Sequence, residues 1–281
     1  IEMINPLYGA ITGIGREHLG FFETMETVVE EEGTLAEFLP LNGKLFICPN
    51  NDWAESILIR SRAPVVTVGL GGTPNWRASV LRSEINKIRF FVHSPTGDFD
   101  GEYELNLTGQ HQVPNALLAI AIGWEFKLTA EEIRQGLKNV CPPAMRMQIQ
   151  KWQNVYIIND AYNANPDSVA AALKTLSQIE CSGKKIAVLG TMAELGTYTE
   201  QAHREVGELA ARLGVERLIA VGEFANLMSD AAVKNGLKFV DVCPDVQSAA
   251  ECLKSICNDD DVVLIKASRS AKLEKILEFL N

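Results

Sequence analysis

The chain has 281 residues, of which 47% are hydrophobic and 22% are charged, and its formal net charge at pH 7 is −10. The composition is typical of a globular protein, and the length suggests two domains. An acidic chain lacks the basic surface that nucleic acids require, and no apolar run reaches the roughly 20 residues of a membrane span, so we expect neither a nucleic acid nor a membrane as partner.

The six cysteines form no Cys-x-x-Cys pair, and no histidine stands at zinc-ligand spacing from them. This pattern favours reduced thiols over a metal site or a disulfide framework. Reduced thiols are typical of the cytoplasm, so we expect a cytoplasmic protein.

Strand and helix patterns alternate through the first part of the chain and then give way to hairpins. Apolar, β-branched runs predict strands, and runs of helix formers predict helices. The strands are expected at 7–12, 44–48 and 64–68, and the helices at 25–39, 53–60, 116–124 and 129–140. The alternating segments from 76 to 107 predict antiparallel hairpins with a turn at Pro95–Asp98. Thr129 opens a capping-box pattern for the last of these helices.

A run that contains two prolines, Cys141–Arg146, is expected to interrupt helix and sheet alike. We place a domain boundary there, which gives domains 1–143 and 144–281. In the second domain, strands are expected near 155–158, 185–189, 217–221, 238–241 and 262–266, with helices near 168–178, 199–213, 224–235, 246–256 and 270–280. This alternation predicts a parallel, doubly wound, Rossmann-like sheet, and the fold class is α/β.

Polar loops follow three of the strands expected in the second domain. The first loop, Asn159–Ser168, carries a carboxylate, a phenol and several amides, and the others are Gly190–Gly196 and Lys266–Ser270. The carboxyl ends of parallel strands meet at one edge of a sheet, where open α/β sheets bind ligands. We therefore expect the loops to gather into a site, with Asp167 or Ser168 capping the helix after the first loop. The alternative is that Asn159–Ser168 is only a turn rich in capping residues, with no ligand.

The three loops resemble the C-terminal signatures of the bacterial Mur ligases. Segments 160–168, 188–196 and 265–270 carry this resemblance, and segments 11–19 and 109–117 resemble the central ATPase domain of the same family. The similarity runs in order over nearly the whole chain. The Asp-x-Tyr-Asn-Ala-Asn-Pro loop is most similar to the branch that adds D-alanyl-D-alanine, and the Asp-Asn-Pro-Arg motif of a sister branch is absent.

The resemblance implies a fold and a reaction. The fold would be the remainder of a central ATPase domain, with a mixed sheet and helices, followed by a Rossmann-like ligase domain. ATP would phosphorylate the terminal carboxylate of a UDP-muramoyl peptide, and the amine of D-alanyl-D-alanine would attack the acyl phosphate. The implied setting is peptidoglycan precursor synthesis by a cytoplasmic, monomeric enzyme that uses Mg²⁺, a hard ion that takes oxygen ligands.

The resemblance assigns the metal site to Glu2, His18 and Glu32. Glu2 and His18 match a family glutamate and histidine beside magnesium, and His18 would also be catalytic. Glu32 stands where the family has a carbamylated lysine, and we expect its shorter carboxylate to replace the carbamate and to be catalytic as well. Without the resemblance, Glu2 would be an exposed chain end, His18 a structural histidine and Glu32 part of a solvated acidic face.

The resemblance also assigns the nucleotide contacts. His111 and Asn115 match the loop near the adenine, although His111 could equally cap or pack. Arg146 matches an arginine near the ATP phosphates and would be catalytic, with an ion pair as the structural alternative. Asp160 matches the carboxylate that accepts from the ribose hydroxyls.

Five further residues match positions near the reacting peptide. Asn163 would be catalytic beside the acyl phosphate, and the substrate-binding group would consist of Asn165, Lys266, Ser268 and Arg269. A fork-shaped guanidinium such as that of Arg269 suits a substrate carboxylate.

The chain departs from the family pattern in several places. No Gly-x-x-Gly-Lys phosphate loop occurs, because Gly69–Thr73 lacks the lysine, and Met3 runs directly into Ile4 where the family has further residues. We therefore expect a phosphate loop and a UDP-binding domain outside this sequence, and no turnover by residues 1–281 alone. Thr191 and Ala267 also replace the family's usual aspartate and glycine. Two alternatives remain open, namely another Mur-type ligase of the polyglutamate or cyanophycin kind and a non-catalytic nucleotide-binding remnant.

Overall fold

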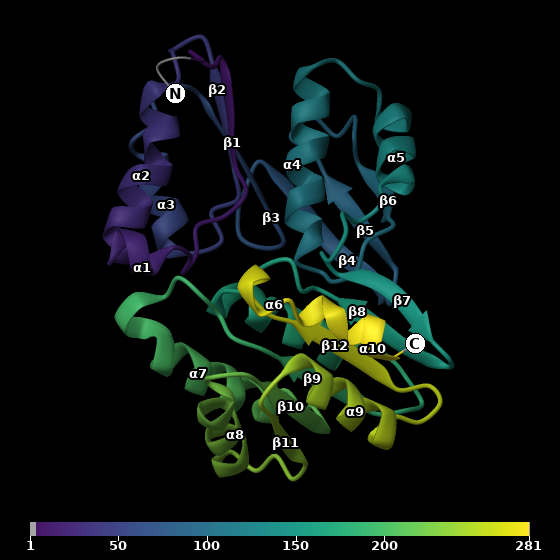
Figure 1. Cartoon of the computed structure of the whole chain (residues 1–281). Coiled ribbons are helices and arrows are strands. Elements are labelled where there is room, and N and C mark those ends of the chain that lie inside the picture. The colour runs from purple at the N-terminus through teal and green to yellow at the C-terminus, as the bar shows by residue number, and fades with distance from the viewer. Residues whose placement is uncertain (1–3, 281) are drawn as a thin grey trace. The chain divides into compact units, whose positions relative to one another are not determined.

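The computed structural model describes residues 4–280 and divides into two compact units (Figure 1). The first unit takes the described residues up to Gly15 together with Phe22–Cys141. The second takes Arg16–Phe21 together with the described residues from Pro142 onward. The division lies close to the boundary placed between 1–143 and 144–281, which stays a prediction. A short segment from the first half of the chain therefore belongs to the second unit.

The first unit is built on a six-stranded sheet with the strand order β1-β2-β3-β4-β5-β6. These are β1 (Tyr8–Ile11), β2 (Lys44–Ile47), β3 (Val65–Gly69), β4 (Trp76–Glu84), β5 (Lys87–His93) and β6 (Gly101–Leu105). The strands from β1 to β4 pair in parallel, and those from β4 to β6 pair antiparallel, as the hairpin pattern predicts. The helices of this unit are α2 (Met25–Phe38), α3 (Asp52–Leu58), α4 (Gln112–Glu125) and α5 (Ala130–Asn139).

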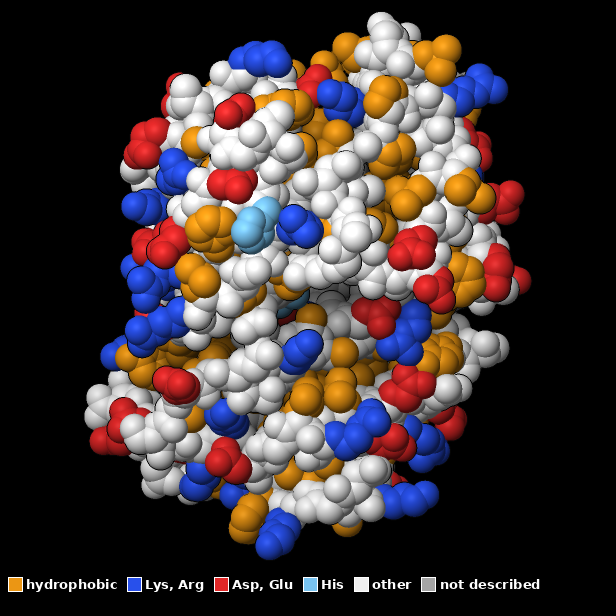
Figure 2. All heavy atoms as spheres, turned by 180° about the vertical axis from the view of Figure 1, so that it is seen from behind, with side chains coloured by type: hydrophobic (Ala, Val, Ile, Leu, Met, Phe, Trp, Pro, Cys, Tyr) orange, Lys and Arg blue, Asp and Glu red, His pale blue; other side chains and the backbone are white. Residues whose placement is uncertain are grey.

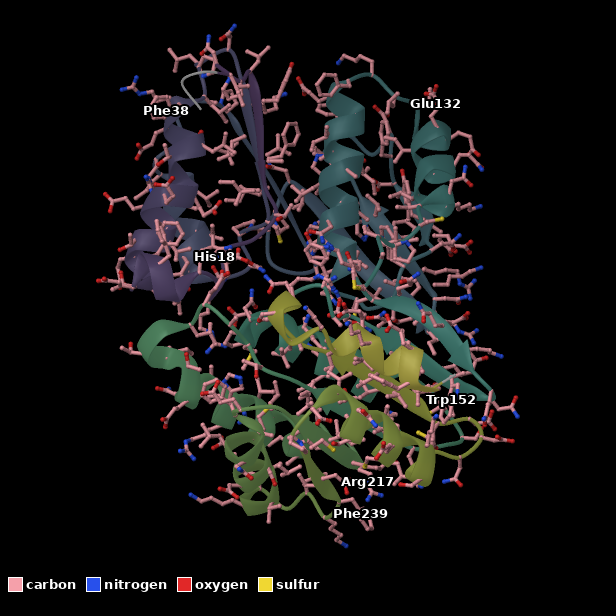
Figure 3. The ribbon with its side chains drawn as sticks, viewed as in Figure 1. His18, Phe38, Glu132, Trp152, Arg217 and Phe239 are labelled. Atoms are coloured by element: carbon pink, nitrogen blue, oxygen red, sulfur yellow. The ribbon has the colours of Figure 1, made fainter. Side chains whose placement is uncertain are left out.

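The core of the first unit forms where α4 packs on the sheet. Alanine, leucine and isoleucine dominate this helix, and it contacts β2, β3, β4 and β5. Trp76 is fully buried against it, with its ring edge-on to those of Phe99 and Trp124 at 5.9 Å in each case. The capping box predicted at Thr129 is present, with Glu132 at the start of α5 (Figure 3).

The second unit has a six-stranded sheet with the order β11-β10-β9-β12-β8-β7. The strands are β7 (Gln148–Trp152), β8 (Val155–Asn159), β9 (Lys185–Leu189), β10 (Arg217–Val221), β11 (Val240–Cys243) and β12 (Val262–Lys266). The helices are α6 (Pro166–Gln178), α7 (Thr199–Arg212), α8 (Ala225–Lys234), α9 (Val246–Ile256) and α10 (Ile276–Leu280). Five strands are parallel, as predicted, and the α/β class is confirmed.

Alternate residues of the central strands bury their side chains against α9 and α10. Ile157, Val188, Ile219 and Val263 belong to this core cluster together with residues of the two helices. The other three helices of this unit pack on one another, α6 on α7 and α7 on α8 (Figure 1). Because both faces of the sheet are covered, the strands are apolar along most of their length.

Five local features of the elements differ from those predicted. β7 was not predicted. It pairs antiparallel with β8 at the edge of the sheet, where a strand can form from a mixed polar and apolar sequence such as Gln-Ile-Gln-Lys-Trp. The helix expected at 116 begins at Gln112, since the missing N–H of Pro114 removes no bond in a first turn. Asn165, and neither Asp167 nor Ser168, caps α6.

The prediction of one helix over 270–280 is also wrong, because this segment forms two 3₁₀ turns, Arg269–Ala271 and Leu273–Lys275, and the short α10. Lys272 lies between the two turns with a left-handed backbone, φ 51°, which a helix does not accommodate. A single turn of helix, α1 (Leu19–Phe22), follows His18 where only a turn was expected.

Acidic and basic side chains are interspersed on the face drawn in Figure 2, and neither sign gathers into one patch there. Among the described residues, no helix combines the length and apolar character that crossing a bilayer demands.

Gly207 offers a direct test of the contact between α7 and α8. A Cβ at Gly207 would lie 2.1 Å from the carbonyl oxygen of Met228 in α8, and a backbone atom cannot rotate away. We expect Gly207→Ala to lower the free energy of unfolding by about 1–3 kcal/mol, the usual cost of overpacking.

The matched control is Gly136→Ala in α5, where an added Cβ meets nothing within 4 Å. Alanine should there raise the free energy of unfolding by about 0.5–1 kcal/mol, its helix advantage over glycine. Chemical denaturation of both variants measures the difference, and equal effects would contradict the packing described for α7 and α8.

Candidate functional site

Three loops lie together at the carboxyl edge of the sheet in the second unit. They follow β8, β9 and β12, and Ser268 joins them. Its hydroxyl donates to the carbonyl of Ala164 at 3.1 Å and accepts from the N–H of Ala193 at 2.8 Å. Its own N–H donates to the carbonyl of Thr191 at 2.9 Å. The gathering of the loops predicted from the sequence is confirmed by these bonds.

Beside Ser268, Asp160 and Lys266 form a buried ion pair. The Lys266 ammonium is only 3% exposed and lies 2.5 Å from Oδ2 of Asp160, whose side chain is 13% exposed. It also donates to the carbonyl of Asn163 at 3.0 Å, and Oδ1 of Asp160 accepts from the N–H of Met147 at 2.9 Å. Two residues assigned by resemblance to different ligands therefore hold each other in place.

The asparagines of the first loop have different surroundings. Asn165 accepts from the N–H of Ser168 at 2.7 Å, and the Ser168 hydroxyl accepts from the N–H of Asn165 at 3.0 Å, which completes a capping box. Asn163 is exposed, and its side-chain Oδ1 accepts from the N–H of Ala164 at 2.9 Å. Its amide nitrogen is thus the more accessible hydrogen-bond donor of the two.

Two arginines lie near the first loop of the second unit. The Arg146 guanidinium stacks over the ring of Tyr162 with its central carbon 4.2 Å from the ring centroid. Arg269 donates to Oε1 of Glu274 at 2.7 Å and contacts the Met145 sulfur at 3.2 Å. Arg269 is still 55% exposed, so a substrate carboxylate could reach the guanidinium beside Glu274.

The segment Arg16–Phe21 is fastened to the second unit by Arg16. Its N–H and guanidinium bind both oxygens of Asp167 at 2.7–3.0 Å, and Nη1 reaches the Tyr198 hydroxyl and Glu205 at 2.8 Å each. Tyr198 donates to Glu205 at 2.5 Å. Arg16 thus joins the first turn of α6 to α7 and to the 3₁₀ turn before α7.

This arrangement brings His18 to the loop after β9. Nδ1 of His18 lies 2.6 Å from Oε2 of Glu194, and the N–H of Gly20 donates to the Glu194 carbonyl at 2.7 Å (Figure 3). A Cβ on Gly196 would lie 3.1 Å from the Cα of Gly20. The two glycines therefore permit a close approach of backbones that are distant in the sequence.

The first unit contains a pocket of about 700 Å³ at the carboxyl ends of β1, β2 and β3. His111 and Asn115, assigned to the adenine by resemblance, both line it, as do Cys48, Asn50 and the turn Gly69–Pro74. The first turn of α4 borders the pocket, and the positive end of its helix dipole favours an anion. The volume lies in the range of small-molecule sites.

The three residues assigned to the metal do not form a site within either unit. Glu32 is exposed on α2 in the first unit, His18 belongs to the second unit, and Glu2 lies outside the described residues. Among residues 4–280, no group of three or more His, Cys, Asp or Glu side chains is arranged to hold a metal ion. The assignment of Glu2, His18 and Glu32 stays a prediction.

Several residues of these sites were not found by sequence reasoning. Arg16 and its partners Tyr198 and Glu205 are separated by more than 180 positions, so no local pattern marks their network. His203, whose Nε2 accepts from the N–H of Met192 at 3.0 Å, lies in an ordinary amphipathic helix, α7. The lining residue Asn50 could have been noticed, because it follows a predicted strand directly, as the polar loops do.

Comparison with known proteins gives two family matches and many relatives. The Mur ligase middle domain matches residues 1–123, and the glutamate ligase domain of Mur ligases matches residues 145–269. The UDP-N-acetylmuramoyl-tripeptide–D-alanyl-D-alanine ligases of Mycobacterium tuberculosis and Escherichia coli are 32% and 30% identical to the chain. The alignments cover 99% and 100% of the chain but 59% and 61% of these relatives, so the chain spans about three-fifths of their length.

Solved structures show the same fold. MurF from Acinetobacter baumannii superposes with a TM-score of 0.89 at 24% identity, covering 99% of this chain and 60% of that one. MurF from Thermotoga maritima in complex with ADP gives 0.84 at 21% identity, with 98% and 61% covered. At this level of identity, the likeness concerns the fold alone.

Lys266 tests whether the buried pair holds the loops. Removing the ammonium leaves the Asp160 carboxylate buried and unpaired, which is strongly destabilising. We expect Lys266→Met to lower the free energy of unfolding by about 3–5 kcal/mol in chemical denaturation. Lys174→Met, on the exposed face of α6, is the control and should change it by less than about 0.5 kcal/mol. A Lys266 variant as stable as the control would refute the structural role of the pair.

Arg16 tests the attachment of the His18 segment. Arg16→Met removes all guanidinium bonds to Asp167, Tyr198 and Glu205, and we expect a loss of about 1 kcal/mol, since charged hydrogen bonds at a partly exposed site are screened. The amide of Gly20 should also exchange faster with deuterium. Arg204→Met, which removes a single exposed 3.6 Å ion pair with Glu200, serves as control. Unchanged Gly20 exchange in Arg16→Met would show that the segment is held by other contacts.

Proposed function

The chain belongs to the Mur ligase family, and we propose that it is part of an ATP-dependent ligase that joins D-alanyl-D-alanine to UDP-N-acetylmuramoyl-tripeptide. The relatives of this name align with nearly the whole chain. The observation that carries the proposal is the joining of the three signature loops by Ser268 at one sheet edge. Peptidoglycan precursor synthesis in the cytoplasm by a monomeric enzyme is the proposed setting.

The proposed reaction has two steps. A carboxylate oxygen of the tripeptide attacks the γ-phosphorus of ATP, and ADP leaves with the electrons of the broken P–O bond. The amine of D-alanyl-D-alanine then attacks the acyl carbon, loses a proton, and expels phosphate. Both steps develop negative charge on oxygen, so they require positioning together with cations or N–H donors.

The loops of the second unit offer such groups. We assign the Arg146 guanidinium, oriented by Tyr162, to the phosphates of the nucleotide. The exposed amide of Asn163 can donate to an oxygen of the acyl phosphate, and Arg269 can bind a substrate carboxylate. Lys266 donates to Asp160 and to the Asn163 carbonyl, and so fixes the backbone that carries the Asn163 amide.

The pocket in the first unit suits the nucleotide. Amide and imidazole groups of Asn115 and His111 can bond to the edge of a base, and the adjacent first turn of α4 favours negative charge. The glycine turn leaves room for close contact, because an added Cβ at Gly71 would meet nothing within 4 Å. We propose that Asp160 accepts from the ribose hydroxyls, since each of its oxygens keeps a further lone pair.

We further propose that Mg²⁺ accompanies ATP, held by Glu2, His18 and Glu32. Carboxylate oxygens suit this ion, and Glu32 would present its carboxylate where the family has a carbamylated lysine. The His18 ring has one nitrogen on Glu194, which leaves the other for the ion. The described residues alone present no complete donor set, so no step of the reaction is derived through the ion.

An activity assay on the full-length protein tests the proposal. We expect ADP release that requires UDP-N-acetylmuramoyl-tripeptide and D-alanyl-D-alanine together, with little release when either is omitted. Replacing the dipeptide with glutamate, or with aspartate and arginine, should give no ligation. ADP release with those acceptors instead would identify a polyglutamate or cyanophycin type of ligase. ATP binding without release under all conditions would identify a non-catalytic nucleotide-binding protein.

A further inference from the structure

His203 is a buried ionisable side chain that the proposed reaction does not use. It lies in α7, is 0% exposed, and packs on the ring of Phe224 at 4.6 Å. Nδ1 lies 2.7 Å from the Thr199 carbonyl oxygen, and Nε2 lies 3.0 Å from the N–H of Met192. A carbonyl can only accept and an N–H can only donate. The backbone therefore requires a neutral ring with its proton on Nδ1.

Met192 belongs to the loop Gly190–Glu194, whose backbone is held at almost every residue. The N–H of Gly190 donates to the Lys266 carbonyl at 2.9 Å, and that of Ala193 donates to the Ser268 hydroxyl at 2.8 Å. The Glu194 carbonyl accepts from Gly20. His203 accepts from the N–H of Met192, so its protonation state decides whether this N–H is bonded.

We propose that His203 is a positioning residue that fixes the loop Gly190–Glu194 by accepting a hydrogen bond from Met192 while its ring is neutral. A second proton, on Nε2, would point at the Met192 N–H and replace attraction by repulsion between two donors. The Met192 backbone would then move, and the adjacent bond from Ala193 to Ser268 would loosen with it. The Ser268 junction of the three loops would thereby respond to pH.

The surroundings of His203 favour the neutral form. Burial lowers the pKa of His203 below its ordinary value, and this outweighs the Thr199 carbonyl bond and the charge of Glu223, which raise it. Glu223 lies in the turn before α8. Of the other acids on elements around α7, Glu194 pairs with His18 and Asp167 with Arg16.

The sign of the pH effect follows from this lowered pKa. As the pH falls below about 6.5, the ordinary pKa of histidine, His203 in the unfolded chain binds a proton that His203 in the native protein does not bind. The unfolded state then binds more protons than the native state, so the contribution of His203 lowers the stability progressively with acidification. Above about pH 7.5 both states are neutral at this site, and the contribution is constant.

Hydrogen exchange of the Met192 amide in the full-length protein tests the proposal. His203→Gln places an amide oxygen that can accept from Met192 and does not titrate, whereas His203→Leu offers no acceptor. His93→Gln, on β5 in the first unit, is the matched control. Exchange rates are measured from about pH 8 to about pH 5, a range that brackets histidine titration. Each rate is divided by the intrinsic exchange rate at the same pH, so that only changes in protection remain.

We expect the protection of Met192 to fall about tenfold or more on acidification in the wild type and in His93→Gln. His203→Gln should show protection that is independent of pH, and His203→Leu should lack it at every pH. The same acid loss in wild type and His203→Gln would overturn the proposal, as would full protection in His203→Leu. If the leucine variant does not fold, the comparison of wild type with His203→Gln decides alone.

The ligase assay gives a second readout, which rests on the proposed function. The wild type should lose kcat/KM on acidification more steeply than His203→Gln, once the pH lies far enough below about 6.5 for native His203 to bind a second proton, because only the wild type then loses the bond that holds the loop. Identical acid limbs in the two proteins would count against the proposal. If no protein shows ligase activity, the proposed function fails while the exchange result still stands or falls by itself.

Discussion

The buried pair of Lys266 and Asp160 is the contact on which the site of the second unit depends. The Lys266 side chain is 3% exposed, and burying an ammonium in an apolar interior is costly unless a close anion and further acceptors surround it. Asp160 and the Asn163 carbonyl supply these, and both belong to the loop after β8, whereas Lys266 ends β12. The requirement to neutralise one charge therefore fixes two strand ends against each other.

The third strand end is tied to this pair through Ser268 and His203. Ser268 follows Lys266 closely and bonds to the loop after β9, while His203 holds that same loop from α7. The segment around Gly20 contacts its far end at Glu194. A backbone held from three directions is suited to present groups such as the Asn163 amide in a fixed geometry, and such pre-organisation is what acyl and phosphoryl transfer require.

Much of the second unit could be predicted from sequence because its strands are buried on both faces and read as continuous apolar runs. β7 was not predicted because an edge strand needs no continuous apolar run. The capping role of Asn165 was not predicted because it depends on the backbone angles at that residue, and the sequence offered Asp167 and Ser168 as equally suitable caps. The site residues were named through family resemblance. Their pairing with one another, as in Asp160 with Lys266, depends on distances across 106 positions that no local pattern contains.

A double-mutant cycle on Asp160→Asn and Lys266→Met measures how strongly the two charges hold the loops together. If the two charges hold the loops together, each single change leaves one buried charge unpaired, and the double change removes both. Denaturation of the four proteins should then give a coupling free energy of about 2 kcal/mol or more, with the double variant less destabilised than the sum of the singles. Additive effects, within about 0.5 kcal/mol, would show that the pair does not hold the loops together.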